Sequence, residues 1–306
     1  MTGDGGVLVV VGDVVTDIVA RHAGPLAQHT DTAARTTVLP GGAAANLACW
    51  AASSGAGEVR LLARVGADSL DWHRDALVAA GVRPHLAVDR EVPTGVVIAL
   101  VDSAAERTFV TDGGASVRLG VADWAAAVLD DELLAGADWL HLSGYLFFTE
   151  AGRRVAAAAM AAARALGVPV SVDPASTGFI ETLGVERFLA AVEGVDLLLP
   201  NQAEAALLAG TDDAVAAAKW LSERSVTVVV KLGPAGALAA RDGALLARTP
   251  GLATTPVDST GAGDAFDGGF LAAQLTGAPL AEALAAGCRA GAAAVALIGG
   301  RPPIDA

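Results

Sequence analysis

Short runs of apolar residues that alternate with helical patterns constrain the fold of this chain most strongly. The runs are VLVVV (7 to 11), WLHLSG (139 to 144), VPVSVDP (168 to 174), VDLLLPN (195 to 201) and VTVVVKLG (226 to 233). Continuous apolar runs of this length are typical of strands buried on both faces of a parallel sheet. The helical patterns between them cover residues 43 to 54, 69 to 80, 151 to 166, 203 to 209 and 214 to 224. This alternation predicts an α/β fold with helices on both faces of a parallel sheet.

Two segments interrupt the alternation. Residues 13 to 39 and about 84 to 112 carry the short β-prone stretches TTVLP, GVVIALV and RTFVT, bounded by Pro and Gly. They predict a second, small sheet, and because loops at the carboxyl ends of parallel strands line the ligand crevice, we expect that sheet to act as a lid. The chain ends with two alanine-rich helical patterns, about 263 to 276 and 279 to 297. Since no linker interrupts the sequence, residues 1 to 306 are interpreted as one domain.

Composition limits the partners. Asp and Glu outnumber Lys and Arg 34 to 20, for a net charge of −14, which disfavours nucleic acid and anionic lipid surfaces. The opening MTGDGG lacks the basic region of a signal peptide, and VLVVV is too short to span a bilayer, so no membrane role is expected. Cys49 and Cys288 lie in alanine-rich helical patterns and are interpreted as buried thiols of a protein in the reducing cytoplasm.

The stretch VDSTGAGDAF (257 to 266) predicts an anion site. Gly261, Ala262 and Gly263 precede an apolar helical pattern that begins at Ala265, so their backbone N–H groups are expected to converge at the positive end of a helix. A carboxylate at Asp264 is then placed to accept a proton from an attacking hydroxyl. The alternative is a glycine loop in which Asp264 only favours the helix dipole.

Two stretches together resemble a known family. DSTGAGDAFDGGF is similar to the C-terminal signature of the ribokinase-like (PfkB-type) carbohydrate kinases, with Ser259 in place of a threonine, and PGGAAANLA matches their Gly-Gly signature. The resemblance runs from Gly12 to about Pro303. It implies a Rossmann-like αβα sandwich with a small β-sheet lid, and phosphoryl transfer from ATP with Mg²⁺. It also implies that Asp264 is the catalytic base and that the amides of Gly261, Ala262 and Gly263 stabilise the transferred group.

The resemblance implies a substrate side as well, formed by Asp13, Asp17, Gly41, Gly42, Asn46 and Arg107. Asp17 is expected to accept hydrogen bonds from substrate hydroxyls, and Asn46 to donate and accept. Their alternatives are a turn residue after the first strand and a helix amide that faces solvent. Arg107 is left open between substrate and solvent. Thr94 and Gly95 resemble the hinge of the lid.

The nucleotide side follows from the same resemblance. Asn201 and Glu204 match a pattern that positions Mg²⁺ through water, while a capping box is the alternative, and both can hold. Lys231, Gly233 and Gly236 resemble the turn beside the nucleotide, although Lys231 is also interpretable as an exposed lysine at a strand end. Asp258 and Thr260 occupy positions that hold potassium in cation-activated relatives; otherwise Asp258 ties down its turn.

The acceptor is the least constrained part. Ala43 stands where relatives that act on sugar phosphates carry lysine, which favours an uncharged acceptor, either a free sugar or a nucleoside. A nucleoside would need an apolar base pocket, with Val15, Val97 and Phe109 as its candidates, and a sugar acid would need a cation such as Arg107. A non-catalytic ligand sensor is a further alternative. A dinucleotide oxidoreductase is disfavoured because GDVVTD lacks the glycine-rich turn. An exposed lid face is expected to pair in a homodimer.

Overall fold

A nine-stranded sheet forms the centre of the molecule in the computed structural model, which describes residues 5 to 102, 107 to 129, 132 to 224 and 227 to 304. Strands β12 and β13 run antiparallel to their neighbours, and all other neighbouring pairs are parallel. In spatial order the strands are β13 (Ala244–Thr249), β12 (Ala237–Arg241), β11 (Thr227–Lys231), β10 (Leu197–Leu198), β9 (Val170–Asp173), β8 (Trp139–Ser143), β1 (Val7–Val11), β4 (Glu58–Gly66) and β5 (Val82–Asp89).

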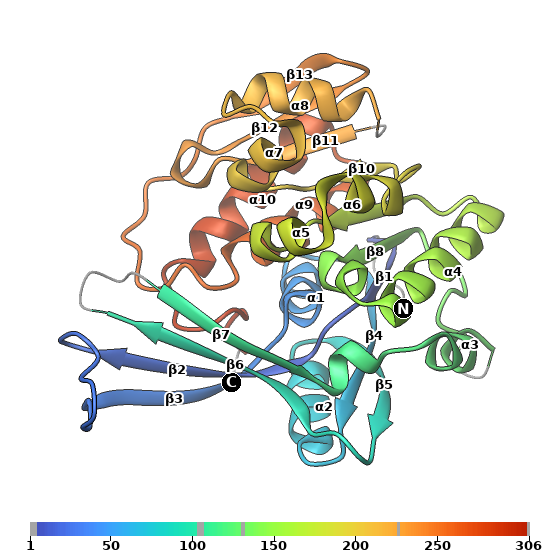
Figure 1. The fold of residues 1–306 in the computed structure, drawn as a ribbon. Coiled ribbons are helices and arrows are strands. Elements are labelled where there is room, and N and C mark those ends of the chain that lie inside the picture. The colour runs from blue at the N-terminus through green and yellow to red at the C-terminus, as the bar shows by residue number, and fades with distance from the viewer. Residues whose placement is uncertain (1–4, 103–106, 130–131, 225–226, 305–306) are drawn as a thin grey trace.

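Helices cover both faces of this sheet, as the alternating side chains of β1 require. Val9 and Val11 pack into one hydrophobic cluster and Leu8 and Val10 into another on the opposite face. The first face carries α3 (Val121–Leu129), α4 (Glu150–Leu166), α5 (Thr177–Leu183), α6 (Val185–Ala191), α7 (Gln202–Ala209) and α8 (Ala214–Ser222). The second carries α1 (Ala43–Ser53), α2 (Leu70–Ala79), α9 (Ala262–Leu275) and α10 (Leu280–Ala294). The predicted αβα sandwich is confirmed (Figure 1).

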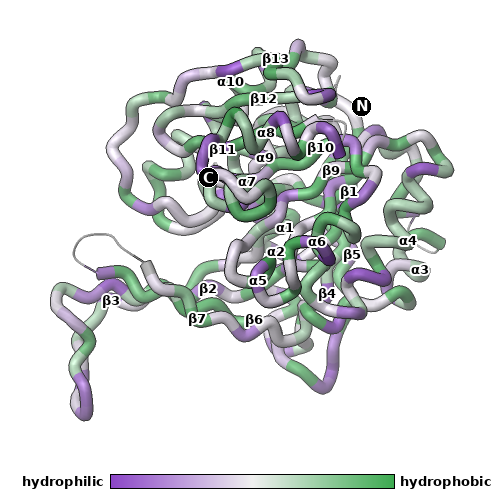
Figure 2. The backbone as a smooth tube through the Cα atoms, turned by 45° about the horizontal axis from the view of Figure 1, so that its top comes forward, coloured by the Kyte–Doolittle hydropathy of each residue, from purple (hydrophilic) through white to green (hydrophobic). Residues whose placement is uncertain are grey.

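A separate four-stranded sheet projects from this body (Figure 2). Its order is β3 (Ala34–Gly41), β2 (Val15–His22), β6 (Thr94–Val101) and β7 (Arg107–Gly114), with β2 and β6 parallel and the outer pairs antiparallel. The second sheet predicted from the sequence is therefore present. Its predicted boundaries differ, since residues 84 to 89 belong to β5, which pairs with β4 at the edge of the large sheet.

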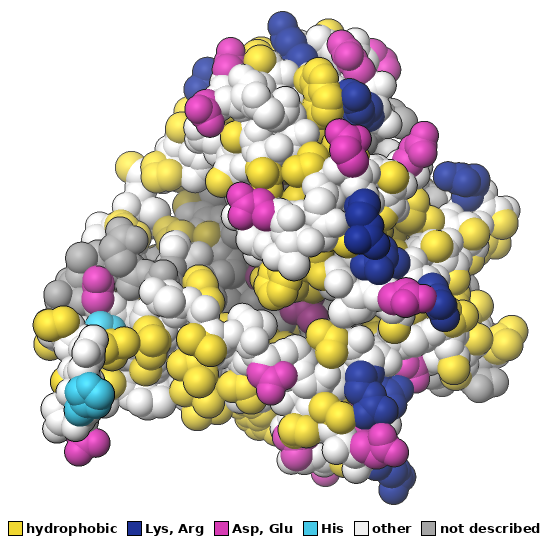
Figure 3. All heavy atoms as spheres, in the orientation of Figure 1, with side chains coloured by type: hydrophobic (Ala, Val, Ile, Leu, Met, Phe, Trp, Pro, Cys, Tyr) yellow, Lys and Arg dark blue, Asp and Glu magenta, His cyan; other side chains and the backbone are white. Residues whose placement is uncertain are grey.

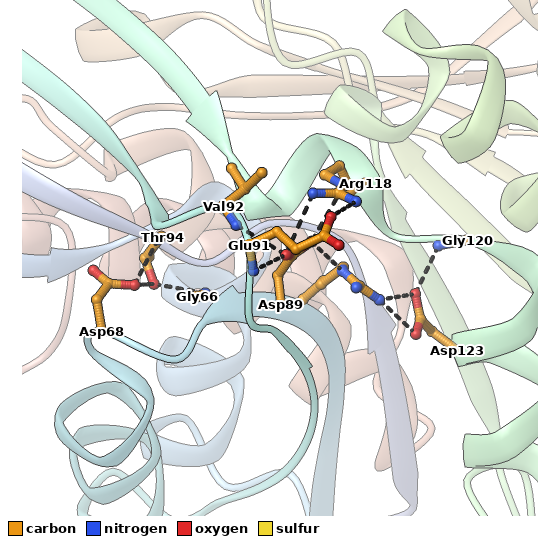
Figure 4. A network of polar contacts seen from close by, with 10 residues as sticks. Gly66, Asp68, Asp89, Glu91, Val92, Thr94, Arg118, Gly120 and Asp123 are labelled. Atoms are coloured by element: carbon orange, nitrogen blue, oxygen red, sulfur yellow. Dashed lines mark hydrogen bonds and ion pairs between the residues drawn. The ribbon is translucent and has the colours of Figure 1, made fainter.

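A polar network joins the small sheet to the ends of β4 and β5 (Figure 4), and we call it the junction network. Asp68 accepts from the backbone N–H of Thr94 at 2.9 Å, and the Thr94 hydroxyl accepts from Gly66 N–H at 2.9 Å. Asp89 accepts from the amides of Glu91 and Val92 and pairs with arginines, including Arg118 of the short helix η1 (Ala115–Arg118), 3.2 Å away. The network fixes Thr94, where the small sheet begins its third strand.

The sequence analysis also raised the questions of a membrane span and of the two cysteines. Within the described ranges, no helix has the length and apolar character needed to cross a membrane. Cys49 and Cys288 are buried and are not joined in a disulfide.

Candidate active site

The first turn of α9 lies at the carboxyl edge of the large sheet, beside the ends of β1, β8, β9 and β11. Gly261 precedes the helix with φ of +73°, a left-handed conformation that side chains other than glycine rarely adopt. A Cβ atom at Gly261 would lie 2.5 Å from the Cα of Gly300. Both the backbone angle and the contact therefore require glycine here.

The amides at this turn leave donors for a ligand. Ala262 N–H donates to the Ser259 carbonyl at 3.3 Å. In the part of the chain that the structure describes, the N–H groups of Gly261, Gly263 and Asp264 have no protein acceptor. These donors lie at the positive end of a helix, where backbone N–H groups can accept an anion as a partner.

Asp264 lies in the same turn and is a weak acid. Asn46 of α1 donates its Nδ2–H to Asp264 Oδ2 at 3.0 Å. Burial raises the pKa of Asp264 to about 8; Asn46 and Lys231 oppose the rise, while Asp173 and Asp13 add to it. A carboxylate with a pKa near neutral pH suits a general base, because it takes up a proton readily at the pH of the reaction.

Asp17 of β2 lies in the small sheet, with its carboxylate against Gly41. A Cβ atom at Gly41 would collide with the Asp17 carboxylate, so glycine makes room for this side chain. Burial raises the pKa of Asp17 to about 7, although the nearby Arg301 lowers it. Gly42 has φ of +101°, and a Cβ there would lie 2.5 Å from the Asp13 carbonyl oxygen. The Gly-Gly pair thus lets the chain pass close to both aspartates.

Asp13 binds protein groups. Its carboxylate accepts from Ala43 N–H at 2.7 Å, from Ala44 N–H at 3.3 Å and from the Ser143 hydroxyl at 2.9 Å. These bonds hold the N-terminus of α1 against β8. Since α1 carries Asn46, Asp13 sets the position of the amide that contacts Asp264.

Arg301 is a site residue that the sequence analysis missed. Its Nη2 donates to the Gly41 carbonyl at 3.0 Å and its Nε to Asn46 Oδ1 at 3.4 Å, while Trp50 of α1 donates to the Gly300 carbonyl at 2.9 Å. Because Arg301 donates to the Asn46 oxygen, the Asn46 amide nitrogen is the atom turned to Asp264. The only sequence signal was a lone charge between Gly-Gly and Pro-Pro.

The comparison with known proteins decides the family. The model of the pfkB family carbohydrate kinases matches residues 7 to 306. The chain belongs to this family. It is 32% identical to a fructokinase of Klebsiella pneumoniae over 86% of this chain and 82% of that protein, and 30% identical to a cytidine kinase of Thermococcus kodakarensis over 92% of each. The solved structure of a probable sugar kinase from Rhizobium etli superposes with a TM-score of 0.86 at 25% identity, covering 98% of this chain and 96% of that chain.

As a PfkB kinase, the protein is a phosphotransferase that acts on hydroxyl groups. Its predicted nucleotide side is built around α7. Asn201 and Glu204 form a capping box: Asn201 Oδ1 accepts from Glu204 N–H at 2.9 Å, and Glu204 Oε2 accepts from Asn201 N–H at 2.9 Å. Burial and the neighbouring Asp173 raise the pKa of Glu204 to about 7, and Lys231 opposes the rise. The capping alternative is therefore present in this kinase.

Lys231 of the PfkB kinase is buried at the end of β11. Its Nζ donates to Asp173 at 2.8 Å and to Asp267 of α9 at 2.9 Å, and it lies 3.6 Å from the position of a Cβ at Gly263. Burial lowers the pKa of Lys231, but these carboxylates raise it above its usual value overall, so the lysine stays charged. The strand-end lysine is thus buried beside the first turn of α9. Asp267 was not singled out in the sequence.

The remaining predicted residues flank this centre. Gly233 and Gly236 make the turn between β11 and β12, with φ of +56° and +95°. Asp258 accepts from Thr260 N–H at 2.9 Å and Gly299 N–H at 3.1 Å, so it ties the turn before α9 to the C-terminal loop. Arg107 is the first residue of β7, and its side chain lies outside the described residues.

Proposed function

We propose that this PfkB kinase transfers the γ-phosphoryl group of ATP to a hydroxyl of an uncharged sugar, with Asp264 as the general base. The observation that carries the proposal is the juxtaposition of the Asp264 carboxyl, with its raised pKa, and the free amides of Gly261, Gly263 and Asp264 in one helical turn. The amides supply hydrogen bonds where negative charge develops, and the carboxylate accepts the proton of the attacking hydroxyl.

Asp17 and Asn46 would orient the acceptor. The Asp17 carboxylate lies against Gly41, and Asn46 donates to Asp264. A substrate hydroxyl held between Asp17 and Asn46 would therefore have Asp17 as a hydrogen-bond acceptor and Asp264 as its base. The small sheet that carries Asp17 would then act as a lid that excludes water from the transferred group.

Magnesium and the nucleotide phosphates would be held at the carboxyl edge of β11. Glu204, Asn201 and Asp173 supply hard oxygen atoms, and among the described residues Lys231 is the cation that opposes the rise in the pKa of Glu204. Excess negative charge of this kind fits a divalent cation that keeps most of its water shell. Magnesium would neutralise charge on the phosphates, with Glu204 and Asn201 acting through its water. Gly233 and Gly236 would border the nucleotide.

The proposal includes a monovalent cation beside Asp258 and Thr260 that has a small effect on the rate. The Thr260 hydroxyl is buried, and no described residue hydrogen bonds with it, which suits an oxygen ligand. Arg21 of β2, however, places Nη2 3.9 Å from Asp258 Oδ2 and donates to the Val257 carbonyl at 3.3 Å. Positive charge is therefore already present, and added potassium has less to contribute.

A nucleoside acceptor is the second candidate, because one face of the small sheet is apolar around Asp17. Val97 pairs with Asp17, and Phe109 pairs with Ala99, two residues further along β6, so Val97 and Phe109 share the face of Asp17. Val15, two residues before Asp17, lies on it too. Phe109 is 52% exposed and thus available to a base or sugar ring.

A turnover screen separates these candidates. ADP release would be measured with MgATP and a panel of free pentoses, free hexoses, sugar acids and nucleosides, with Asp264→Asn as the matched negative control. We expect turnover with neutral sugars. Turnover with nucleosides alone would select the second candidate, whereas tight binding measured by thermal shift without any turnover would indicate a ligand sensor.

We also propose that the outer face of the small sheet pairs with a second copy. Val38, Ile18, Ile98 and Val110 are in register across its four strands, on the face opposite Asp17. Val38 and Val110 are each 55% exposed, and Figure 3 shows apolar side chains gathered along this sheet. Light scattering should give a dimer for the native chain and a monomer for Val110→Glu; a monomeric native chain would contradict the pairing.

A further inference from the structure

A small pocket borders Asp264, and four of its eight lining residues are polar. It has a volume of about 10 Å³, enough for one water molecule. Its lining residues are Ala43, Ala44, Leu47, His141, Ser143, Asp173, Ala175 and Asp264. Since Asp173 and Asp264 both line this pocket, a hydrogen-bond donor that reaches their carboxyl groups there would stabilise the ionised forms.

His141 of β8 is such a donor, because its neighbours fix the position of its proton. The His141 Nδ1 lies 2.9 Å from the Ser171 hydroxyl, which also accepts from Trp139 Nε1–H at 3.0 Å. Trp139 can only donate, so the Ser171 proton needs another acceptor, and within the described residues His141 Nδ1 is the one available. Ser171 therefore donates to Nδ1, and the proton of a neutral His141 is on Nε2.

The imidazole stays neutral in this setting. Burial lowers the pKa of His141 to about 4; Lys231 adds to the effect, and Asp173 opposes it. The charged and titratable groups around Asp264 are Asp13 after β1, Asp173 of β9, Lys231 of β11 and Tyr145 after β8. Because Nδ1 is occupied by Ser171 and His141 lines the pocket, Nε2 is the ring nitrogen that is left to act as a donor there.

We propose that His141 is a positioning residue for Asp264, donating its Nε2–H to a water molecule in this pocket that in turn donates to the Asp264 carboxylate. Together with Asn46, it gives the ionised base two donors on different sides of the carboxyl group. The inference rests on the proposed role of Asp264 as general base. In this proposal Trp139 and Ser171 hold His141 in the Nε2–H tautomer, which donates toward Asp264.

The pH dependence of kcat/KM tests the proposal. Loss of the donor in His141→Leu should move the acid limb to higher pH, so that activity falls about tenfold on that limb, for a shift of about one pH unit, and less than about twofold on the alkaline plateau. His141→Gln keeps an N–H near the Nε2 position and should retain the native limb. An equal loss at all pH values in both variants would indicate a packing role and overturn the proposal.

Two spectroscopic measurements keep this test independent of turnover. In ¹⁵N NMR of the native protein, His141 should be the Nε2–H tautomer, and Ser171→Ala should abolish that preference; an Nδ1–H tautomer in the native protein would overturn the proposal even if His141→Leu does not fold. A ¹³C titration of the Asp264 carboxyl, assigned with Asp264→Asn, should give a higher pKa in His141→Leu. An unchanged carboxyl pKa overturns the role of His141, whereas loss of the general-base role alone would appear as full activity in Asp264→Asn.

Discussion

Asp89 at the end of β5 and Asp264 in the first turn of α9 both lie at the carboxyl edge of the large sheet, but their environments are opposite. In the junction network, Asp89 accepts from two backbone amides and pairs with Arg64 and Arg118, and the amide hydrogen bonds lead the causes that lower its pKa to about 2. Asp264 accepts from one amide side chain, and burial raises its pKa to about 8.

The difference separates structure from chemistry. A carboxylate that accepts several hydrogen bonds is a poor base, because protonation would break those hydrogen bonds. The same hydrogen bonds stabilise the fold at neutral pH, where the carboxylate is ionised. A carboxylate with few donors takes up a proton readily but makes folding less favourable. The junction therefore contributes stability and α9 contributes reactivity, because Asp89 has many donors whereas Asp264 is buried with few.

The largest expected effect is that of Asp264→Asn. Turnover should fall by about 100-fold or more, the scale of losing a general base, while ATP affinity stays near native. The substitution also removes an acid that ionises more easily in the unfolded chain. Native stability should thus decline from about pH 4 to pH 8 relative to the variant, which urea unfolding at several pH values would measure. Near-native turnover in the variant would refute the assigned role.

The pH profile of the native kinase is the next largest effect. Since the pKa of Asp264 is about 8, kcat/KM should rise about tenfold per pH unit below that value and level off above it. Steady-state rates from pH 5.5 to 9.5, with saturating magnesium, would measure this. A flat profile across pH 6 to 8 would mean that the base is already ionised there.

Asp89→Asn should have the opposite effect to Asp264→Asn: a loss of stability with little change in turnover. Because the pKa of Asp89 is depressed to about 2, its contribution to stability is present above pH 4 and is lost as the pH falls toward 2. The variant should unfold at lower urea concentration at pH 7 and lose the acid sensitivity that comes from this group. Its kcat should change by less than about twofold, since the side chain is remote from the reacting atoms. A large fall in kcat with native stability would contradict the separation.

The smallest expected effect concerns potassium. Replacing sodium by potassium should change the native rate by less than about threefold, because Arg21 already supplies a charge beside Asp258. Arg21→Gln removes the charge but keeps a polar side chain, and should increase the response to potassium. An equal response in the two proteins would show that Arg21 does not stand in for the ion.

Much of the fold was predictable, and the exceptions have physical causes. The five apolar runs all became strands, because both of their faces are buried. Strand β4 was missed because Arg60 and Arg64 interrupt its pattern, yet Arg60 donates to the carbonyls of Leu133 and Ala135, and Arg64 pairs with Asp89 and Asp123. Arg60 also pairs with Glu58 of its own strand, but the other partners of the two arginines lie on segments that only folding brings close.

The site shows the same limit. Motifs located the turn at Asp264, the Gly-Gly pair and the α7 capping box, because those residues meet local backbone requirements. The sequence analysis missed three site residues, because each is placed by a partner on another element. Arg301 donates to Asn46, Asp267 accepts from Lys231, and His141 hydrogen bonds with Ser171. Their catalytic and binding roles remain proposals.

The loop that carries Gly300 and Arg301 bonds to Trp50 and Asn46, some 250 positions earlier in the chain. During synthesis, the helix bearing Asn46 leaves the ribosome long before the arginine that orients its amide. A nascent chain that ends before this loop would therefore have the sheet strands but no oriented amide beside Asp264, so catalytic competence should arise late, in one step, when the loop docks.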